Sequence, residues 1–176
     1  MKSYLPHTWF DARLDVGPSR MHGQGIYATS PIAQAEIVMI WGGTPYTQSD
    51  LDSGSVPPGT SYSVIAEDVV LAGPEDGMDY YLNHSCEPNL WMGDEVTLVA
   101  RFDIARGEEL LIDYAMVESE ADYVLDACRC DSDHCRVVIT GQDWRQPTLQ
   151  ERYQDRFLPF INDRIAQLGG TGRPPP

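Results

Sequence analysis

The stretch Asn83-His84-Ser85-Cys86-Glu87-Pro88-Asn89 carries the densest group of chemically active side chains in this chain of 176 residues. It places two amides, an imidazole, a hydroxyl, a thiol and a carboxylate within seven residues. A surface turn uses Asn, Ser and Pro for their backbone conformations, but it has no need of an imidazole and a thiol together. The stretch therefore predicts a binding or catalytic site rather than ordinary core.

The chain has four cysteines, and three of them lie in the run Cys128-Arg129-Cys130-Asp131-Ser132-Asp133-His134-Cys135. A tetrahedral Zn²⁺ takes four soft donors at about 2.3 Å. Cys128, Cys130 and Cys135 supply three thiols, and Cys86 supplies the fourth if the fold brings it near. Such a closed site would hold one structural ion. His134 competes for the fourth place, although its position beside Cys135 makes joint ligation awkward. Independent free thiols are the alternative.

Zinc ligation by Cys86 would fold residues 128–135 back over residues 83–89. Disulfides are a competing use of four cysteines, but a bridge from Cys128 to Cys130 would strain its short loop. The first residues also lack the apolar segment of a secretory signal, which predicts a reducing compartment. We expect a cytoplasmic location in a bacterium, and a nuclear or cytoplasmic one in a eukaryote.

Length and charge limit the function classes. A chain of 176 residues with 42% hydrophobic residues predicts one domain, and no apolar run reaches the roughly 18 residues of a membrane span. The net charge of −15 argues against binding nucleic acid through the general surface and favours a basic partner. Residues 94–133 carry twelve acidic side chains against three arginines, which form either a solvated face or a docking surface for a basic substrate.

Most of the chain predicts short strands, because β-branched and aromatic residues stand between Gly and Pro residues. The predicted strands are 13–16, 21–28, 37–43, 62–66, 69–72, 96–100 and 109–114. The fourth and fifth form a hairpin that turns at Glu67-Asp68. Residues 44–60 are rich in Ser, Pro and Gly, which predicts a loop or a short helix within it from Thr47 to Leu51. Ala105-Arg106-Gly107 forms the turn before the last strand.

The C-terminal part predicts helices. Thr148-Leu149-Gln150-Glu151 has the pattern of a capping box, Pro159 kinks or restarts the helix, and Gly169-Gly170 can cap it. The apolar stripe packs on this domain or on a second copy, which would make a homodimer. Residues 171–176 are predicted to be a disordered tail. The stripe recurs at intervals of three or four residues and consists of Leu149, Tyr153, Phe157, Ile161, Ile165 and Leu168.

Four segments, in this order, resemble motifs of the SET-domain protein-lysine methyltransferases. Gly23-Gln24-Gly25-Ile26-Tyr27-Ala28 resembles their N-terminal Gly-x-Gly segment, and residues 83–89 match their Asn-His-Ser-Cys-x-Pro-Asn motif. Gly107-Glu108-Glu109-Leu110-Leu111-Ile112-Asp113-Tyr114 is similar to their Gly-Glu-Glu-Leu-x-x-Asp-Tyr motif, and residues 128–135 are similar to their post-SET Cys-x-Cys-x-x-x-x-Cys. The resemblance covers residues 12 to 140.

The resemblance implies a mainly β fold of small curved sheets (β-clip or SET fold with a pseudoknot), followed here by a C-terminal helical segment. It implies S-adenosylmethionine as methyl donor and lysine in a basic protein, histone-like or other, as acceptor. Tyr114 would be the active-site tyrosine. Tyr62, which lies outside any strict motif, would line the lysine channel. The residues implied for donor binding are Gly23, Gln24, Gly25, Tyr27, Asn83 and His84.

The implied organisation is a lead-in at 1–11, a SET domain at 12–120, a post-SET zinc segment at 121–140 and a helical extension at 141–170. Two departures from the family stand out. Tyr80-Tyr81-Leu82 replaces the frequent Arg-Phe-Ile, and Ile112 stands where Phe or Tyr is frequent, which would leave room for higher methylation states. These departures leave open a catalytically silent, peptide-binding SET-like module. A zinc enzyme of another class would need an open metal position.

Overall fold

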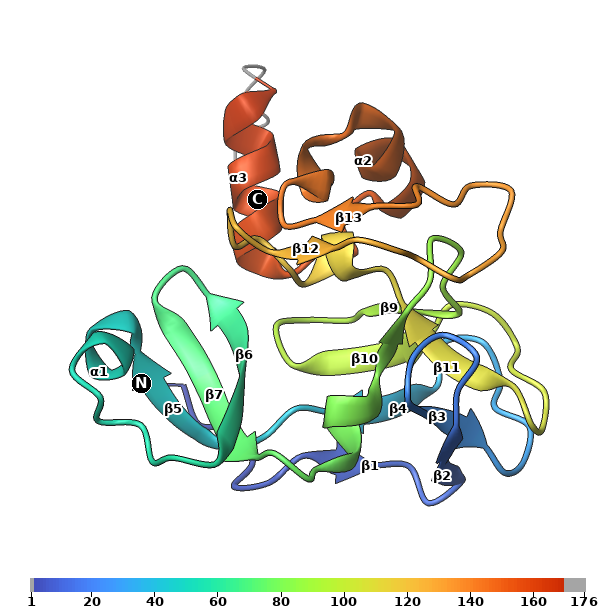
Figure 1. Cartoon of the computed structure of the whole chain (residues 1–176), viewed down its shortest axis with the longest axis horizontal. Helices are drawn as coiled ribbons and strands as arrows, with labels where there is room; N and C mark the ends of the chain where they lie inside the picture. The colour runs from blue at the N-terminus through green and yellow to red at the C-terminus, as the bar shows by residue number, and fades with distance from the viewer. Residues whose placement is uncertain (1, 170–176) are drawn as a thin grey trace.

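The computed structural model describes residues 2–169, which form small β-sheets with helices gathered at the C-terminal end (Figure 1). One sheet has the order β1-β4-β10-β9, with strands Trp9–Phe10, Ile37–Ile40, Thr97–Ala100 and Leu90–Met92. A second has the order β2-β3-β11-β8, with strands Leu14–Pro18, Gln24–Ala28, Glu109–Ile112 and Asn83–His84. The predicted mainly β class is confirmed.

A third sheet, β5-β7-β6, lies at the left of Figure 1 beside α1 (Gln48–Asp52). Its strands are Thr44–Thr47, Val69–Pro74 and Thr60–Ala66, so the predicted hairpin is confirmed. The prediction of a loop from residue 44 is wrong over β5, because pairing with β7 overrides the turn-rich composition of this stretch. The predicted short helix is α1, which Thr47 and Asp50 cap reciprocally.

The pairing of β8 with β11 brings two distant motifs together. The two strands are parallel, with Asn83 opposite Leu111. Asn89 extends the contact with its side chain, which donates from Nδ2 to the carbonyl of Glu109 and accepts at Oδ1 from the N–H of Leu111, both at 2.8 Å. Residues 83–89 are therefore held on β11 at both ends.

The predicted strands differ from the observed ones at their ends, and the predictions did not include the short strands β1, β8 and β9. β3 begins after residue 23, and β11 ends where Asp113 accepts a hydrogen bond from Ala115 and caps η2 (Tyr114–Met116). The predicted turn at 105–107 is present, and Gly107 has a φ of +86°, which suits glycine. This turn joins two different sheets. The remaining short elements are η1 (Met78–Tyr81), β12 (Val124–Leu125), β13 (Ile139–Thr140) and η3 (Asp143–Arg145).

The C-terminal helices are α2 (Pro147–Tyr153) and α3 (Pro159–Leu168), so Pro159 restarts the helix as predicted. The predicted capping box at Thr148 is wrong, since α2 begins one residue earlier with Pro147 in its first turn. Gly169 is the C-cap of α3, whereas Gly170 and the predicted tail lie outside the described residues. Within residues 2–169, no helix has the length and apolar character to cross a bilayer.

The apolar stripe of these helices packs on its own domain. Leu149, Tyr153, Phe157 and Ile161 are at most 3% exposed and belong to the core that lies between the sheets and the helices. Only the end of the stripe reaches solvent, at Leu168, which is 56% exposed. A homodimer through this stripe is therefore not supported.

We expect Leu149→Ala to lower the free energy of unfolding by about 2–5 kcal/mol, because the lost side chain leaves a cavity in the core. Leu168→Ala is the matched control and should change it by less than about 0.5 kcal/mol. Urea unfolding followed by tryptophan fluorescence measures both. A large effect at Leu168 with none at Leu149 would mean that the outer end of the stripe, and not its inner face, is buried.

Candidate active site and metal centre

The four cysteines converge on one point. Their Sγ atoms all lie within 4.8 Å of one another, and those of Cys86 and Cys128 are 4.0 Å apart. Donors at about 2.3 Å from a tetrahedral zinc ion are roughly 3.8 Å apart, so this thiol group fits zinc. His134 is outside the group, because its side chain is 54% exposed and turned towards Glu87 at 3.9 Å.

The thiols of this cluster differ in acidity without a metal. Burial raises the pKa of Cys86 to about 11. Burial also opposes ionisation of Cys130, but hydrogen bonds from Ser132 outweigh it and lower the pKa to about 6. The backbone N–H of Arg136 points at the Sγ of Cys86 from 3.4 Å, which favours its thiolate form. A bound cation would supply the charge that keeps all four thiols ionised.

A buried ion pair ties the cysteine loop to the end of β11. The guanidinium of Arg136 donates two hydrogen bonds to Asp113, at 2.7 and 2.6 Å, and a third to Asp143 at 2.8 Å. Tyr153 of α2 donates to Asp113 at 2.8 Å. Burial opposes ionisation of Asp113, which is fully buried, but Arg136 outweighs this and lowers its pKa. The residue before Tyr114 is thus fixed by the residue after Cys135.

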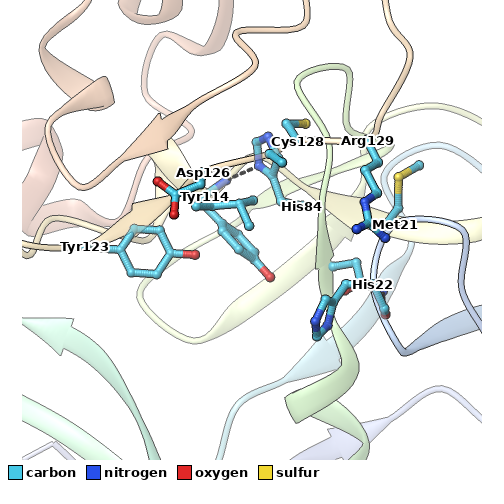
Figure 2. A pocket seen from close by; sticks show the side chains of 11 residues that line it. Met21, His22, His84, Tyr114, Tyr123, Asp126, Cys128 and Arg129 are labelled. Carbon is cyan, nitrogen blue, oxygen red and sulfur yellow. Dashed lines mark hydrogen bonds between the residues drawn. The ribbon is translucent and has the colours of Figure 1, made fainter.

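A cavity of about 410 Å³ lies beside the cysteine loop, and Figure 2 shows its side chains. His84 stands in its wall with both ring nitrogens engaged: Nδ1 accepts from the N–H of Tyr114 at 3.1 Å, and Nε2 lies 3.3 Å from the Sγ of Cys86. Burial lowers the pKa of His84 to about 4, so the ring is neutral. The cavity is lined by Met21, His22, Asn83, His84, Tyr114, Tyr123, Leu125, Asp126, Ala127, Cys128 and Arg129.

Asn83 faces this cavity and is held by Glu109. Its Nδ2 donates to the carbonyl of Gln24 at 2.7 Å and to Oε1 of Glu109 at 2.9 Å. Glu109 also accepts from the hydroxyls of Ser19, at 2.7 Å, and Tyr27, at 3.3 Å. A side chain at position 25 would collide with this carboxylate, which requires glycine there.

Not all of the predicted donor-binding residues line this cavity. Asn83 and His84 line the cavity. Of the residues that the structure describes, the pair Met21 and His22 contributes to the lining from the N-terminal motif, whereas the lining does not include Gly23, Gln24, Gly25 or Tyr27. Roles for these four stay predictions.

A second cavity, of about 240 Å³, shares only Tyr114 with the first. The hydroxyl of Tyr114 donates to the carbonyl of Leu82 at 3.0 Å, and burial raises its pKa. Tyr62, the other tyrosine singled out by the sequence, stands at the edge and is 52% exposed. The lining consists of Trp41, Tyr62, Ser63, Val64, Asp79, Leu82, Ile112, Tyr114, Val117, Glu118 and Glu120.

Sequence reasoning missed Tyr123 and the role of Glu109. The ring of Tyr123 meets that of Tyr114 edge-on, with centroids 6.1 Å apart, and burial raises its pKa to about 12. The available signal was an aromatic residue within the acidic segment 118–126. Glu109 lies in a motif, but the motif does not reveal its partners, because they come from three separate segments.

Comparison with known proteins agrees with the motifs. Residues 23–115, just over half of the chain, match the SET domain family. The chain is 30% identical over 146 residues to histone-lysine N-methyltransferase ATX2 of Arabidopsis thaliana, covering 74% of this chain and 13% of that protein. It is 32% identical over 141 residues to the H3 lysine-4 specific histone-lysine N-methyltransferase of Schizosaccharomyces pombe, covering 72% and 15%.

A third similar protein is histone-lysine N-methyltransferase ASHH2 of Arabidopsis thaliana, which is 36% identical over 119 residues, covering 60% of this chain and 7% of that protein. The chain thus spans between 7% and 15% of the length of these three relatives.

We expect the purified protein to contain about one zinc ion per chain, and Cys86→Ser to lose most of it, because zinc has four donors in such closed sites. His134→Ala is the control and should keep its zinc, since His134 lies outside the thiol group. Metal analysis by mass spectrometry measures the content. Full zinc content in Cys86→Ser would remove Cys86 from the ligand set.

We expect Arg136→Met to lower the free energy of unfolding at pH 7 by about 3–5 kcal/mol, because it leaves a buried carboxylate without its partner. In the wild type, the lowered pKa of Asp113 adds stability that is present above its unfolded value of about 3.9 and is lost as the pH falls further. In the variant, burial alone would raise that pKa, so stability would be lost as the pH rises above about 3.9.

The free energies of unfolding of the wild type and Arg136→Met, measured by urea unfolding, should therefore differ less at about pH 5 than at pH 7. Arg106→Met, at an exposed turn position, is the control and should resemble the wild type at both pH values. An equal difference at both pH values would contradict the assigned role of Asp113.

Proposed function

Because this chain belongs to the SET-domain family, we propose that it transfers a methyl group from S-adenosylmethionine to the side-chain amine of lysine in a protein. The observation that carries the proposal is the position of Tyr114, which lines two separate cavities. One cavity would take the methyl donor and the other the lysine side chain, with the tyrosine between them.

The donor would occupy the larger cavity, whose volume of about 410 Å³ is typical of small-molecule sites. S-adenosylmethionine supplies a methyl group bonded to a positively charged sulfur. Within residues 2–169, Oδ1 of Asn83 receives no hydrogen bond, so it is available to accept from the donor's ammonium group. The ring nitrogens of His84 are engaged, and this residue would meet the donor through its backbone and ring face.

The lysine must be neutral before it attacks the methyl carbon. With a pKa near 10.4, only about 4 in 10,000 free lysine side chains are neutral at pH 7. The second cavity offers the apolar side chains of Trp41, Leu82 and Ile112, and desolvation there disfavours the ammonium form. The proton can leave to water before attack. The amine nitrogen then forms its bond to carbon as the carbon–sulfur bond breaks.

Tyr114 would orient the amine rather than act as a base. Burial raises its pKa, so its hydroxyl stays protonated near neutral pH. The proton is directed at the carbonyl of Leu82, which leaves the oxygen lone pairs to accept a hydrogen bond from the amine. Such alignment is a large part of catalysis in a displacement reaction.

A basic protein is the proposed substrate, since the chain has a net charge of −15 and Asp79, Glu118 and Glu120 line the second cavity. The relatives are named histone-lysine methyltransferases, which makes a histone the first substrate to try and a nucleus the first location to examine in a eukaryote. The proposed zinc ion would be structural, because its four thiol ligands would hold residues 128–135 against residues 83–89.

The test is incubation of the protein with labelled S-adenosylmethionine and a panel of basic proteins that includes histones. Label on lysine, identified by mass spectrometry, supports the proposal. Donor or peptide binding without any transfer would favour the catalytically silent module instead.

We expect Tyr114→Phe to lower the rate of methyl transfer roughly 100-fold while donor affinity changes little, because the hydroxyl acts only on the amine. Tyr80→Phe is the control, since Tyr80 is 64% exposed and does not line either cavity. Single-turnover rates and calorimetric titration of the donor separate the two effects. Equal loss of rate and donor binding would argue against the orienting role.

A further inference from the structure

A basic cavity stands out on this acidic protein. The chain has 27 acidic residues against 12 basic ones, yet Arg101 and Arg152 both line a cavity of about 390 Å³. This cavity shares no lining residue with the two cavities described above. Its other lining residues are Glu87, Pro88, Asn89, Phe102 and His134.

The two guanidinium groups are half-buried and lack carboxylate partners. Among residues 2–169, no carboxylate oxygen lies within 4.0 Å of Arg101 or Arg152. Arg101 donates to the carbonyl of Pro88 at 3.4 Å, and Arg152 to that of Cys86 at 3.0 Å. A guanidinium has five N–H donors, so most remain unused. Elsewhere in this chain, the partly buried Arg13 and Arg136 both bind carboxylates.

Aromatic rings hold the two groups in place. The guanidinium of Arg101 lies 4.7 Å from the ring centre of Phe102 and 5.6 Å from that of Tyr153, and Arg152 lies 5.9 Å from the same Tyr153 ring. Burial lowers the pKa of Arg101, and the charge of Arg152 adds to this effect, while Tyr153 and nearby carboxylates oppose it. Two like charges are therefore kept side by side without a carboxylate in ion-pair contact with either, an arrangement that an anion would stabilise.

We propose that this cavity binds a phosphate monoester. Two guanidinium groups match the geometry of phosphate oxygens, which they bind in bidentate fashion. A monoester carries a charge of about −1.5 to −2 at pH 7, which nearly balances the positive charge of two arginines. Glu87 is the one acidic residue in the lining, and it faces His134 at 3.9 Å. The phosphate could belong to a free small molecule or to a phosphorylated side chain of a protein.

Bound phosphate would also act on the turn of Cys86. Arg152 already donates to the carbonyl of Cys86, so an anion on its remaining donors would join α2, this turn and Arg101. A ligand that binds only the folded state raises the stability of that state, by an amount that grows with the logarithm of ligand concentration above Kd. This inference does not depend on methyl transfer.

The experiment is calorimetric titration of the zinc-loaded protein with inorganic phosphate, O-phosphoserine and a serine phosphopeptide, with dimethyl phosphate and acetate as singly charged controls. We expect saturable binding of the dianions and at least tenfold weaker binding of the controls. Tighter binding of the phosphopeptide would assign the phosphate to a protein, whereas tighter binding of inorganic phosphate would assign it to a small molecule. Equal affinity for phosphate and acetate, or no saturable binding, would overturn the proposal.

Arg101→Gln and Arg152→Gln should each weaken phosphate binding about 10- to 100-fold, the loss expected for a hydrogen bond to a charged group. Arg106→Gln, at an exposed position outside the cavity, should bind phosphate as the wild type does. Circular dichroism establishes that each variant is folded. Arg101→Lys keeps the charge without the planar guanidinium, so its phosphate affinity should lie between those of the wild type and Arg101→Gln. Unchanged binding in folded Arg101→Gln and Arg152→Gln would place the phosphate elsewhere and overturn the proposal.

Discussion

The parallel pairing of Asn83–His84 with the end of β11 is the constraint on which the rest of the site depends. It lets the imidazole of His84 accept a hydrogen bond from the N–H of Tyr114. Cys86, two residues further along the chain, then faces the cysteine loop. Because Asn89 adds two side-chain hydrogen bonds to the same strand, this segment is held at both ends. The two cavities that share Tyr114 and the group of four thiols are all positioned by this one strand pairing.

The net charge of −15 does not describe how acidic and basic side chains are arranged within the fold. The most buried ionic contacts are those of Arg136, which joins Asp113 to Asp143 beneath the cysteine loop. A buried pair of this kind contributes more to fixing one arrangement than to net stability. Arg101 and Arg152 in the basic cavity differ from Arg136, because they lie against aromatic rings, of Phe102 and Tyr153, instead of carboxylates. The protein thus presents acidic groups at the proposed lysine cavity and two arginines beside residues 87–89.

The sequence was sufficient for the features that local patterns encode. The hairpin at Glu67-Asp68, the helix restart at Pro159 and the grouping of four cysteines all follow from residue type and spacing. It was insufficient where tertiary contact decides. Thr44–Thr47 looks like a loop until β7 pairs with it, and Pro147 displaces the apparent cap at Thr148. The lining by Met21, His22 and Tyr123 depends on how three segments meet, which no single motif records.

The burial of Asp113 has a consequence for how the protein is made. Its carboxylate waits for Arg136, 23 positions later, and for Tyr153, 40 positions later. Synthesis runs from the N-terminus, so β11 leaves the ribosome before either partner of this carboxylate. The hydrogen bonds that fix the residue before Tyr114 therefore cannot form while only residues 1–114 have been made. They are completed only when Arg136 and Tyr153 pack against the end of β11, so the wall shared by the two cavities depends on residues that are made after its own motifs.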